Sequence, residues 1–95
     1  MIEHLTFIHF EKEPDPEKQA ELIEKIKAFK VQIPGVIDAQ AGKNFSEGYD
    51  FGLSVRLENK QSFDVYMDHP KHREVATLLN EMGMSDFSVV DFECS

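Results

Sequence analysis

The sequence contains one cysteine, few positive charges and no long apolar run. Because Cys94 is alone, no disulfide can form within the chain. No stretch is apolar enough to span a bilayer, and we expect no signal peptide because the first residues lack its apolar segment. The 18 acidic residues outnumber 10 basic ones, which gives a net charge of -8. Such a surface repels phosphate groups and anionic lipids, so we expect no nucleic-acid partner, no membrane partner and a cytoplasmic location.

The length of 95 residues predicts one domain over residues 1–95, near the size at which burial of a core becomes marginal. A hydrophobic fraction of 41%, with eight phenylalanines, is typical of a globular protein. A sheet of this size often leaves one apolar face uncovered, and a second copy of the chain commonly covers it. We therefore expect a homodimer.

Hydrophobic periodicity predicts four strands and three helices. The strands are 2–10, 36–42, 49–57 and 87–92, and the helices are 16–33, 62–67 and 70–82. Asp15 followed by Pro16 is a helix start, and Pro34-Gly35 ends the same helix. The order strand, helix, strand, strand, helix pair, strand predicts the α+β class. We expect a ferredoxin-like four-stranded antiparallel sheet with the helices on one face.

Strand alternation divides each strand between the two faces of the predicted sheet. The apolar set on residues 49–57 is expected to face the helices, and one apolar set from the strand 2–10 and one from the strand 87–92 would join it in the core. These sets are Phe51, Leu53 and Val55, then Ile8 and Phe10, then Phe87 and Val89. By the same alternation His4 and Asp91 point to the helices. A buried carboxylate needs a partner, and a histidine is a suitable one.

The other face of the sheet is also apolar. It carries Leu5, Phe7, Val90 and Phe92. An exposed aromatic patch of this size is unusual on a monomer, so this face is the predicted homodimer interface. We expect both faces of the strand 2–10 to be covered. His9 is expected to be an interface or surface residue, and Arg56 is expected to pair with an acidic side chain across the two-fold axis.

The segment from Tyr66 to His72, Tyr-Met-Asp-His-Pro-Lys-His, gathers more proton-transferring groups than any other. In the functional interpretation His72 is a general base, Asp91 or a backbone group orients it, and Tyr66 is an acid or an oxyanion donor. The ordinary histidine pKa of roughly 6.5 suits proton abstraction near neutral pH. The predicted substrate-binding residues are His4, Asp91, Leu53, Val55 and His69.

The same cluster also has structural interpretations. His69 would cap the helix that begins at Pro70, Tyr66 would be a core residue, and a His4–Asp91 pair would hold the strand register. A metal site is less favoured, because Pro70 disturbs the helix between His69 and His72 and no cysteine is near. We therefore expect no metal and no cofactor.

Five short motifs, in order over nearly the whole chain, resemble the stress-responsive A/B barrel (Dabb) domain family. They are Met1-Ile2-Glu3-His4, Ile33-Pro34-Gly35-Val36, Gly48-Tyr49-Asp50, Tyr66 with His69-Pro70-Lys71-His72, and Val90-Asp91-Phe92. The resemblance implies a dimeric α+β barrel, in which two sheets pack face to face and the helices cover the outside.

The resemblance also implies a mixed functional picture. Many members have no known activity, whereas one is a polyketide cyclase whose acid-base pair matches Tyr66 and His72. The pocket of that cyclase has residues matching His4 and Asp91, but its further tyrosine falls at Ile26 here. We expect a homodimer that binds a small, partly apolar molecule, with no physiological role assigned. The alternatives are a cyclase-like lyase, a structural oligomer and a cofactor-free monooxygenase, whose group lacks the His-Pro-x-His signature.

Overall fold

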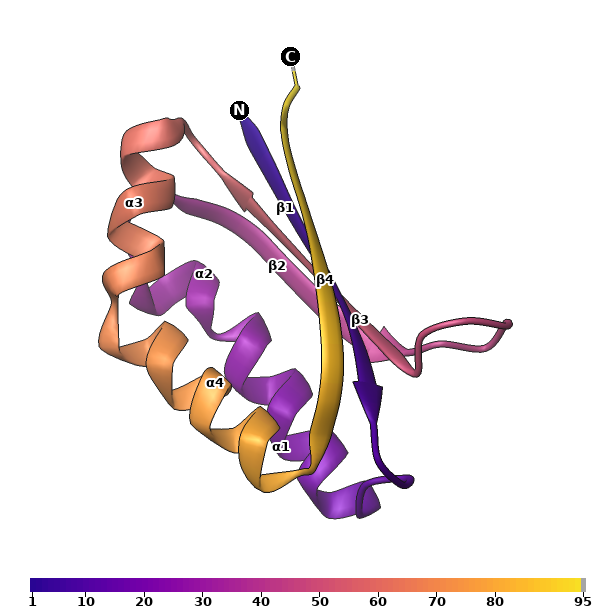
Figure 1. Ribbon diagram of the computed structural model, residues 1–95. Coiled ribbons are helices and arrows are strands. Elements are labelled where there is room, and N and C mark those ends of the chain that lie inside the picture. Colours follow the sequence, from indigo (N-terminus) through magenta and orange to yellow (C-terminus); the bar gives the residue numbers. More distant parts are fainter. Residues whose placement is uncertain (95) are drawn as a thin grey trace.

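The computed structural model describes residues 1–94, so Ser95, the last residue of the predicted domain, lies outside the described residues. Within residues 1–94, four strands form one sheet and four helices lie on one side of it (Figure 1). The strands are β1 (Ile2–Phe10), β2 (Val36–Lys43), β3 (Phe51–Leu57) and β4 (Met84–Glu93). The helices are α1 (Pro16–Lys27), α2 (Phe29–Gln32), α3 (Lys60–Asp68) and α4 (Pro70–Glu81). The predicted α+β, ferredoxin-like fold is confirmed.

The strand order is β2-β3-β1-β4, and every neighbouring pair is antiparallel. In this register His4 of β1 lies opposite both Val55 of β3 and Asp91 of β4. Residues directly opposite each other on neighbouring strands point to the same face of a sheet. The expected placement of His4 and Asp91 on the face that the helices cover is therefore confirmed.

The predicted helix over residues 16–33 is divided in two. It starts as expected, because Asp15 accepts a hydrogen bond from the backbone N–H of Glu17 and Pro16 takes the first helical position. α1 ends at Lys27, and α2 follows after Ala28. Ala28 keeps right-handed helical backbone angles, φ -69° and ψ -16°. The helical spacing of apolar residues therefore runs on through Ala28, and the sequence gives no signal of the division. None of the described helices is both long enough and apolar enough to cross a membrane.

Gly35, between α2 and β2, allows α3 to lie close to the start of the second strand. Its φ of +86° belongs to the left-handed region, which side chains with a Cβ rarely adopt. A Cβ at this position would also collide with the side chain of Ser62 in α3. The backbone N–H of Glu58 donates to the carbonyl of Gly35 at 3.0 Å, which fixes the approach. The glycine therefore helps to place the helix that carries Tyr66.

The core lies between the helices and the sheet. Its largest fully buried side chains are Tyr66, Phe29, Phe51, Ile8, Leu22, Ile26, Leu57 and Val55. They come from the two central strands, β1 and β3, and from α1, α2 and α3, so they join these three helices to the middle of the sheet. The predicted helix-facing set Phe51, Leu53 and Val55 is confirmed as part of this core.

The sheet face away from the helices, called the open face here, carries Leu5, Phe7, His9, Val90 and Phe92. Its β1 residues are only partly buried. One chain alone therefore does not supply the cover that was expected over both faces of β1. Arg56 also lies on this face, and its Nε donates to Oε2 of Glu3 at 2.8 Å. The ion pair predicted to cross a two-fold axis is thus made within the chain, because Glu3 and Arg56 are opposite each other in the β1–β3 register.

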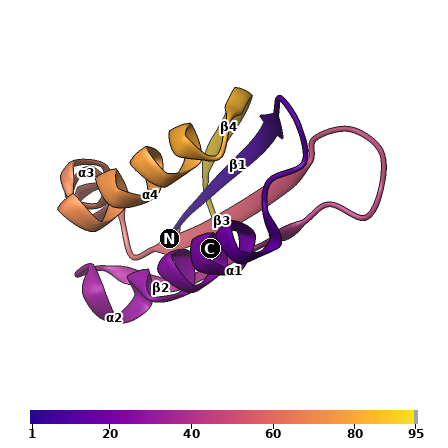
Figure 2. The ribbon, with the colours of Figure 1, turned by 90° about the horizontal axis from the view of Figure 1, so that it is seen from below.

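β4 is exposed on both of its faces. Phe87 and Val89 point to the helix side yet are 54% and 43% exposed, so the prediction that they join the core is wrong. Val90 and Phe92, on the open face, are similarly exposed. The reason is the position of the helices, since α1 and α2 pack against β2 at the opposite edge of the sheet (Figure 2).

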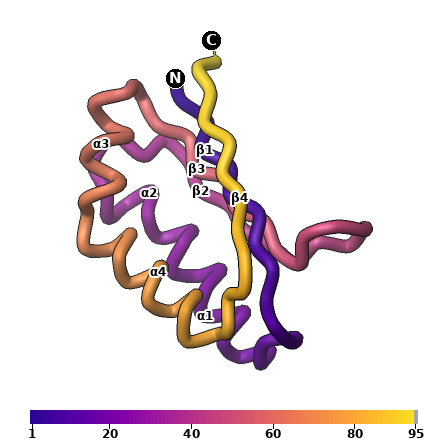
Figure 3. The backbone as a smooth tube through the Cα atoms, in the orientation of Figure 1, coloured from indigo at the N-terminus to yellow at the C-terminus, as the bar shows by residue number. Residues whose placement is uncertain are grey.

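The termini and the β2–β3 loop lie at opposite ends of the sheet (Figure 3). The N-terminal amine of Met1 donates to the carbonyl of Cys94 at 3.0 Å, and the backbone N–H of Cys94 donates to the carbonyl of Met1 at 2.8 Å. At the other end, the loop of residues 44–50 projects away from the helices. One end of the sheet thus has hydrogen bonds between Met1 and Cys94, and the other end has a protruding loop.

Candidate functional site

His4 and Asp91 form the most direct polar contact of the site. Their side chains meet across the β1–β4 pair, with 2.5 Å between Nδ1 of His4 and Oδ1 of Asp91. His4 is buried, whereas the Asp91 side chain is 37% exposed. A carboxylate only accepts, so Nδ1 of His4 carries the proton, and Nε2 lies 3.3 Å from Oγ1 of Thr6. The predicted pair is therefore present, with its carboxylate at the surface.

Tyr66 lies between two histidines. Its ring packs edge-on against the ring of His4, with 5.4 Å between centroids, and lies 4.6 Å from the ring of His72 at a tilt of 51°. Phe29 closes a third side at 5.6 Å. Burial raises the pKa of the Tyr66 hydroxyl far above its ordinary value, because a buried phenolate would lose its hydration. The hydroxyl therefore stays protonated and can donate a hydrogen bond.

His72 is held by a backbone group, one of the two orienters considered. Its Nδ1 lies 3.2 Å from the carbonyl oxygen of Met67, which only accepts, so Nδ1 donates and Nε2 has the lone pair. Burial lowers the pKa of His72 and outweighs the hydrogen bond to Met67, which raises it; the nearby His4 acts in the same direction as burial. The neutral imidazole therefore dominates at neutral pH. Asp91 does not orient His72, because it bonds to His4.

The turn between α3 and α4 brings the ring of His72 next to that of Tyr66. The backbone N–H of His69 donates to the carbonyl of Tyr66, which ends α3, and Pro70 opens α4. Nδ1 of His69 accepts a hydrogen bond from the backbone N–H of Lys71 at 3.1 Å and so caps α4. The structural role considered for His69 is thus present, and its predicted role in substrate binding stays a prediction.

Leu53 and Val55, the apolar members of the predicted substrate-binding set, belong to the hydrophobic core. Leu53 is 7% exposed and Val55 has no exposed surface. Their side chains share the helix-side face of the sheet with His4. A ligand would reach them only after the side chains that cover them had moved, so their binding role also stays a prediction.

A hollow of about 320 Å³ opens beside Asp91, between α3 and the end of β4. It is lined by Ile2, Lys60, Phe63, Asp64, Asp91, Phe92 and Glu93. Nζ of Lys60 and Oε1 of Glu93 form an ion pair of 2.9 Å at its rim. The lining contains Asp91 but neither Tyr66 nor His72, whereas a larger hollow of about 430 Å³ lies near residues 44–50 and contains none of the predicted site residues. Of these two hollows, only the smaller one therefore touches a predicted site residue.

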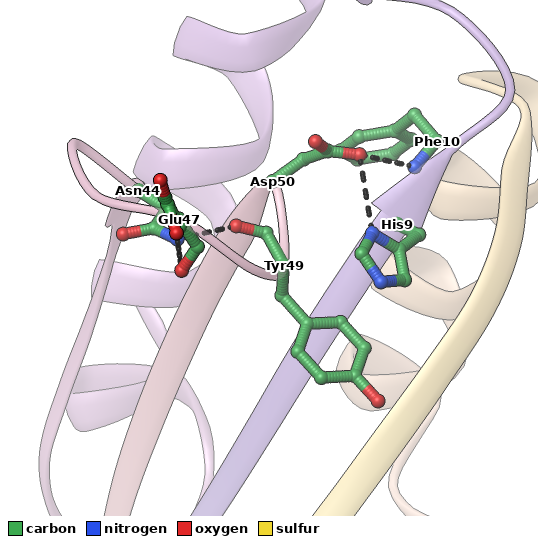
Figure 4. Close-up of polar contacts among 6 residues, drawn as sticks. All are labelled: His9, Phe10, Asn44, Glu47, Tyr49 and Asp50. Carbon is green, nitrogen blue, oxygen red and sulfur yellow. Dashed lines mark hydrogen bonds and ion pairs between the residues drawn. The ribbon is translucent and has the colours of Figure 1, made fainter.

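A second polar cluster, which the sequence did not reveal, lies where the 44–50 loop meets β1 (Figure 4). The rings of His9 and Tyr49 stack with centroids 4.2 Å apart, and Oδ2 of Asp50 lies 3.6 Å from Nδ1 of His9. The same oxygen accepts from the backbone N–H of Phe10 at 2.8 Å. The hydroxyls of Tyr49 and Ser88 are 2.5 Å apart. The Gly48-Tyr49-Asp50 motif was the only signal in the sequence that this region matters.

The part of the chain that the structure describes contains no set of side chains arranged as metal ligands. Among residues 1–94, no group of three or more histidine, cysteine, aspartate or glutamate side chains is placed to hold one ion. Two of the four histidines are instead tied to the backbone, His69 as a helix cap and His72 through Met67. The arrangement is suited to proton transfer and hydrogen bonding by organic side chains.

The chain is similar to several solved structures. An Arabidopsis thaliana protein has a TM-score of 0.85 and 25% identity, with 100% of this chain and 96% of that chain covered. A dimeric ferredoxin-like protein of unknown function from Thermobifida fusca has a TM-score of 0.84 and 23% identity, with 98% and 90% covered. A hydroxynitrile lyase from Passiflora edulis has a TM-score of 0.82 and 11% identity, with 99% and 93% covered.

These likenesses support the fold, and a family comparison identifies the chain. No curated protein shows significant similarity to it. The family model described as the Stress responsive A/B Barrel Domain (Dabb) matches residues 2–94. That match covers nearly the whole chain, so the chain belongs to the stress-responsive A/B barrel (Dabb) domain family.

Proposed function

We propose that this chain, as a single domain, is a homodimeric cytoplasmic protein whose site around Tyr66 binds a small, largely apolar molecule. The observation that carries the proposal is the position of Tyr66, a buried phenol in contact with the rings of both His4 and His72. Two buried polar rings beside a half-buried third reduce stability relative to apolar side chains, and such clusters are frequent at binding sites.

The hollow beside Asp91 lies next to this cluster, because Asp91 bonds to His4. Its walls include the apolar side chains of Phe63 and Phe92, and Asp91 adds a partly exposed carboxylate. Apolar walls with few polar groups are usual in sites for small molecules. Phe63 also packs edge-on against His4, with 5.7 Å between centroids. A ligand in the hollow would therefore touch Phe63 and Asp91, which both contact His4.

The test is a thermal-shift screen of small apolar carbonyl compounds, followed by calorimetry on each compound that raises the melting temperature. We expect Tyr66→Phe and His72→Ala to weaken binding by at least about tenfold, the loss of one good polar contact. Val31→Ala, a change at an exposed residue of α2, is the control and should bind as wild type does. Unaltered binding of every such compound by both site variants would remove Tyr66 and His72 from the site.

A second candidate, an acid-base lyase, is favoured by the opposite pKa changes of His72 and Tyr66. The pKa of His72 is lowered, so Nε2 is available as a base, and the pKa of Tyr66 is raised, so its hydroxyl remains a donor. Nε2 would take a proton from the carbon beside a ketone, while the hydroxyl of Tyr66 would hydrogen bond to the resulting enolate oxygen. The enolate carbon would add to a second carbonyl of the same molecule, and the imidazolium would return the proton to the new alkoxide.

Turnover of a poly-β-keto thioester, followed by chromatography, separates this lyase from simple binding and from a structural oligomer. Loss of turnover in His72→Ala with unchanged melting supports the lyase. If His72→Ala greatly lowers stability and ligand screens stay empty, the cluster is structural.

The open face supports the homodimer. Val90 and Phe92 are 48% and 45% exposed on it, next to the partly buried Leu5 and Phe7. A contiguous apolar patch of this kind is typical of an interface. The Thermobifida fusca relative is described as dimeric, which agrees with a second copy as the cover. Face-to-face packing of two such sheets would enclose the apolar side chains of both chains.

A further inference from the structure

The loop of residues 44–50 presents one aromatic side chain to solvent. The loop rises from the ends of β2 and β3 on the side of the sheet away from the helices (Figures 1 and 2). Phe45 is 101% exposed, so its ring gains almost nothing from its own chain. A fully exposed phenylalanine on a protruding loop is unfavourable in water, and burial against a partner would remove that penalty.

The side chain of Asn44 bonds across the loop that carries Phe45, and Figure 4 shows its contacts with Glu47 and Tyr49. Nδ2 of Asn44 donates to the carbonyls of Tyr49 at 2.5 Å and Glu47 at 3.4 Å, and its Oδ1 accepts from the backbone N–H of Ser46 at 3.0 Å. The backbone N–H of Asn44 also donates to the carbonyl of Asp50 at 2.9 Å. Because the loop is tied at both ends, insertion of Phe45 into a partner would lose little conformational entropy.

A notch lies on the same face, beside the loop. Gly42 of β2 and Gly52 of β3 are directly opposite each other, so two neighbouring strands have no side chain at this level. A hollow of about 480 Å³ lies there, with Phe7, Tyr49 and the chain's own Phe45 among its walls. A Cβ added at Gly42 would meet nothing within 4 Å, which shows that the space over the backbone is open. Tyr49 is held by its stacking on His9 and its contact with Ser88.

We propose that, in the homodimer proposed above, Phe45 of each copy inserts into the Gly42–Gly52 notch of the other. A two-fold interface is self-complementary, so a projecting side chain and a notch on one chain are matched by the same pair on its partner. The notch is continuous with the open face, because Phe7 belongs to both.

Sedimentation velocity over a dilution series tests this arrangement. Phe45→Ser removes the inserted ring, and Gly42→Val fills the notch in a strand where its backbone and surroundings accept a side chain. We expect each change to weaken dimerisation at least about tenfold, the effect of losing one buried aromatic contact. Val31→Ser, at an 85% exposed residue of α2, is the matched control and should not change dimerisation.

A cross-linking experiment gives a second measure, in a Cys94→Ser background. A mixture of Phe45→Cys protein and Gly42→Cys protein should form more disulfide-linked dimer than either protein forms alone. A wild-type dimer whose dissociation constant is unaffected by both interface changes, without heterodimer cross-linking, would overturn the insertion of Phe45 and leave the homodimer standing. A wild-type chain that is monomeric at every concentration would overturn both.

Discussion

At the scale of single residues, backbone and carboxylate acceptors decide which ring nitrogens can act. Asp91 fixes a proton on Nδ1 of His4, and the carbonyl of Met67 fixes a proton on Nδ1 of His72. Nε2 of His4 is already in contact with Oγ1 of Thr6, which makes His72 the stronger candidate for a base. The family motif singled out His72 in the sequence, but its orienting group is a carbonyl that no side-chain pattern reveals.

The His4–Asp91 contact should contribute to stability. We expect Asp91→Ala to lower the free energy of unfolding by about 1–2 kcal/mol, because it leaves the buried Nδ1–H of His4 without its partner. Asp91→Asn, which keeps an acceptor oxygen, should cost less. Urea unfolding measures both. Asp86→Ala, at an exposed position of the same strand, is the control, and an equal loss there would argue against a specific role for Asp91.

His72 should make stability depend on pH. Its pKa in the folded protein is lower than its unfolded value of roughly 6.5, so the unfolded chain binds more protons below that pH. The contribution is complete above the unfolded pKa and is lost as the pH falls toward and through the folded pKa. We expect the stability of wild type to fall more steeply between about pH 7.5 and 5.5 than that of His72→Gln. Equal slopes in urea titrations would contradict the lowered pKa.

At the scale of elements, local signals set the ends of helices well. Asp15-Pro16 opens α1, His69-Pro70 opens α4, and Gly83 follows α4 with a φ of +88°. These are short-range effects of hydrogen bonding and backbone geometry, so the sequence contains them. The division at Ala28 is different, because helical angles continue through it and no residue there disfavours a helix.

The cap at His69 gives a prediction for α4. We expect His69→Ala to lower the free energy of unfolding by about 0.5–2 kcal/mol, because the backbone N–H of Lys71 loses its acceptor. His69→Asn should restore most of the loss, since asparagine is a preferred helix cap. Thermal unfolding of the three proteins provides the comparison. A variant that melts like wild type but loses ligand binding would instead support the predicted binding role of His69.

At the scale of the whole molecule, the distribution of helices decides what is exposed. α1 and α2 lie over β2, and β4 is left as an edge with large apolar side chains on both faces. An exposed apolar edge strand favours association. The acidic net charge of -8 keeps such a chain soluble but does not cover the strand.

The homodimer should be visible as a mass. Sedimentation equilibrium at micromolar concentration should give about 22 kDa, twice the chain mass of 10.9 kDa. Val90→Lys, which places a charge on the open face, should shift the mass toward that of one chain. Val31→Lys makes the same chemical change on α2 and should leave the mass unaltered. A fully folded wild-type chain of about 11 kDa would count against the interface.

The sequence by itself determined the order of elements, the helix caps and the face on which His4 and Asp91 lie. These follow from alternation, periodicity and local hydrogen bonding, which act over a few residues. Only the tertiary structure decided that Asp91 bonds to His4 while a carbonyl holds His72, that β4 is exposed on both faces, and that Phe45 projects beside a notch between Gly42 and Gly52. Those outcomes depend on strand register and helix placement, which join residues distant in the chain.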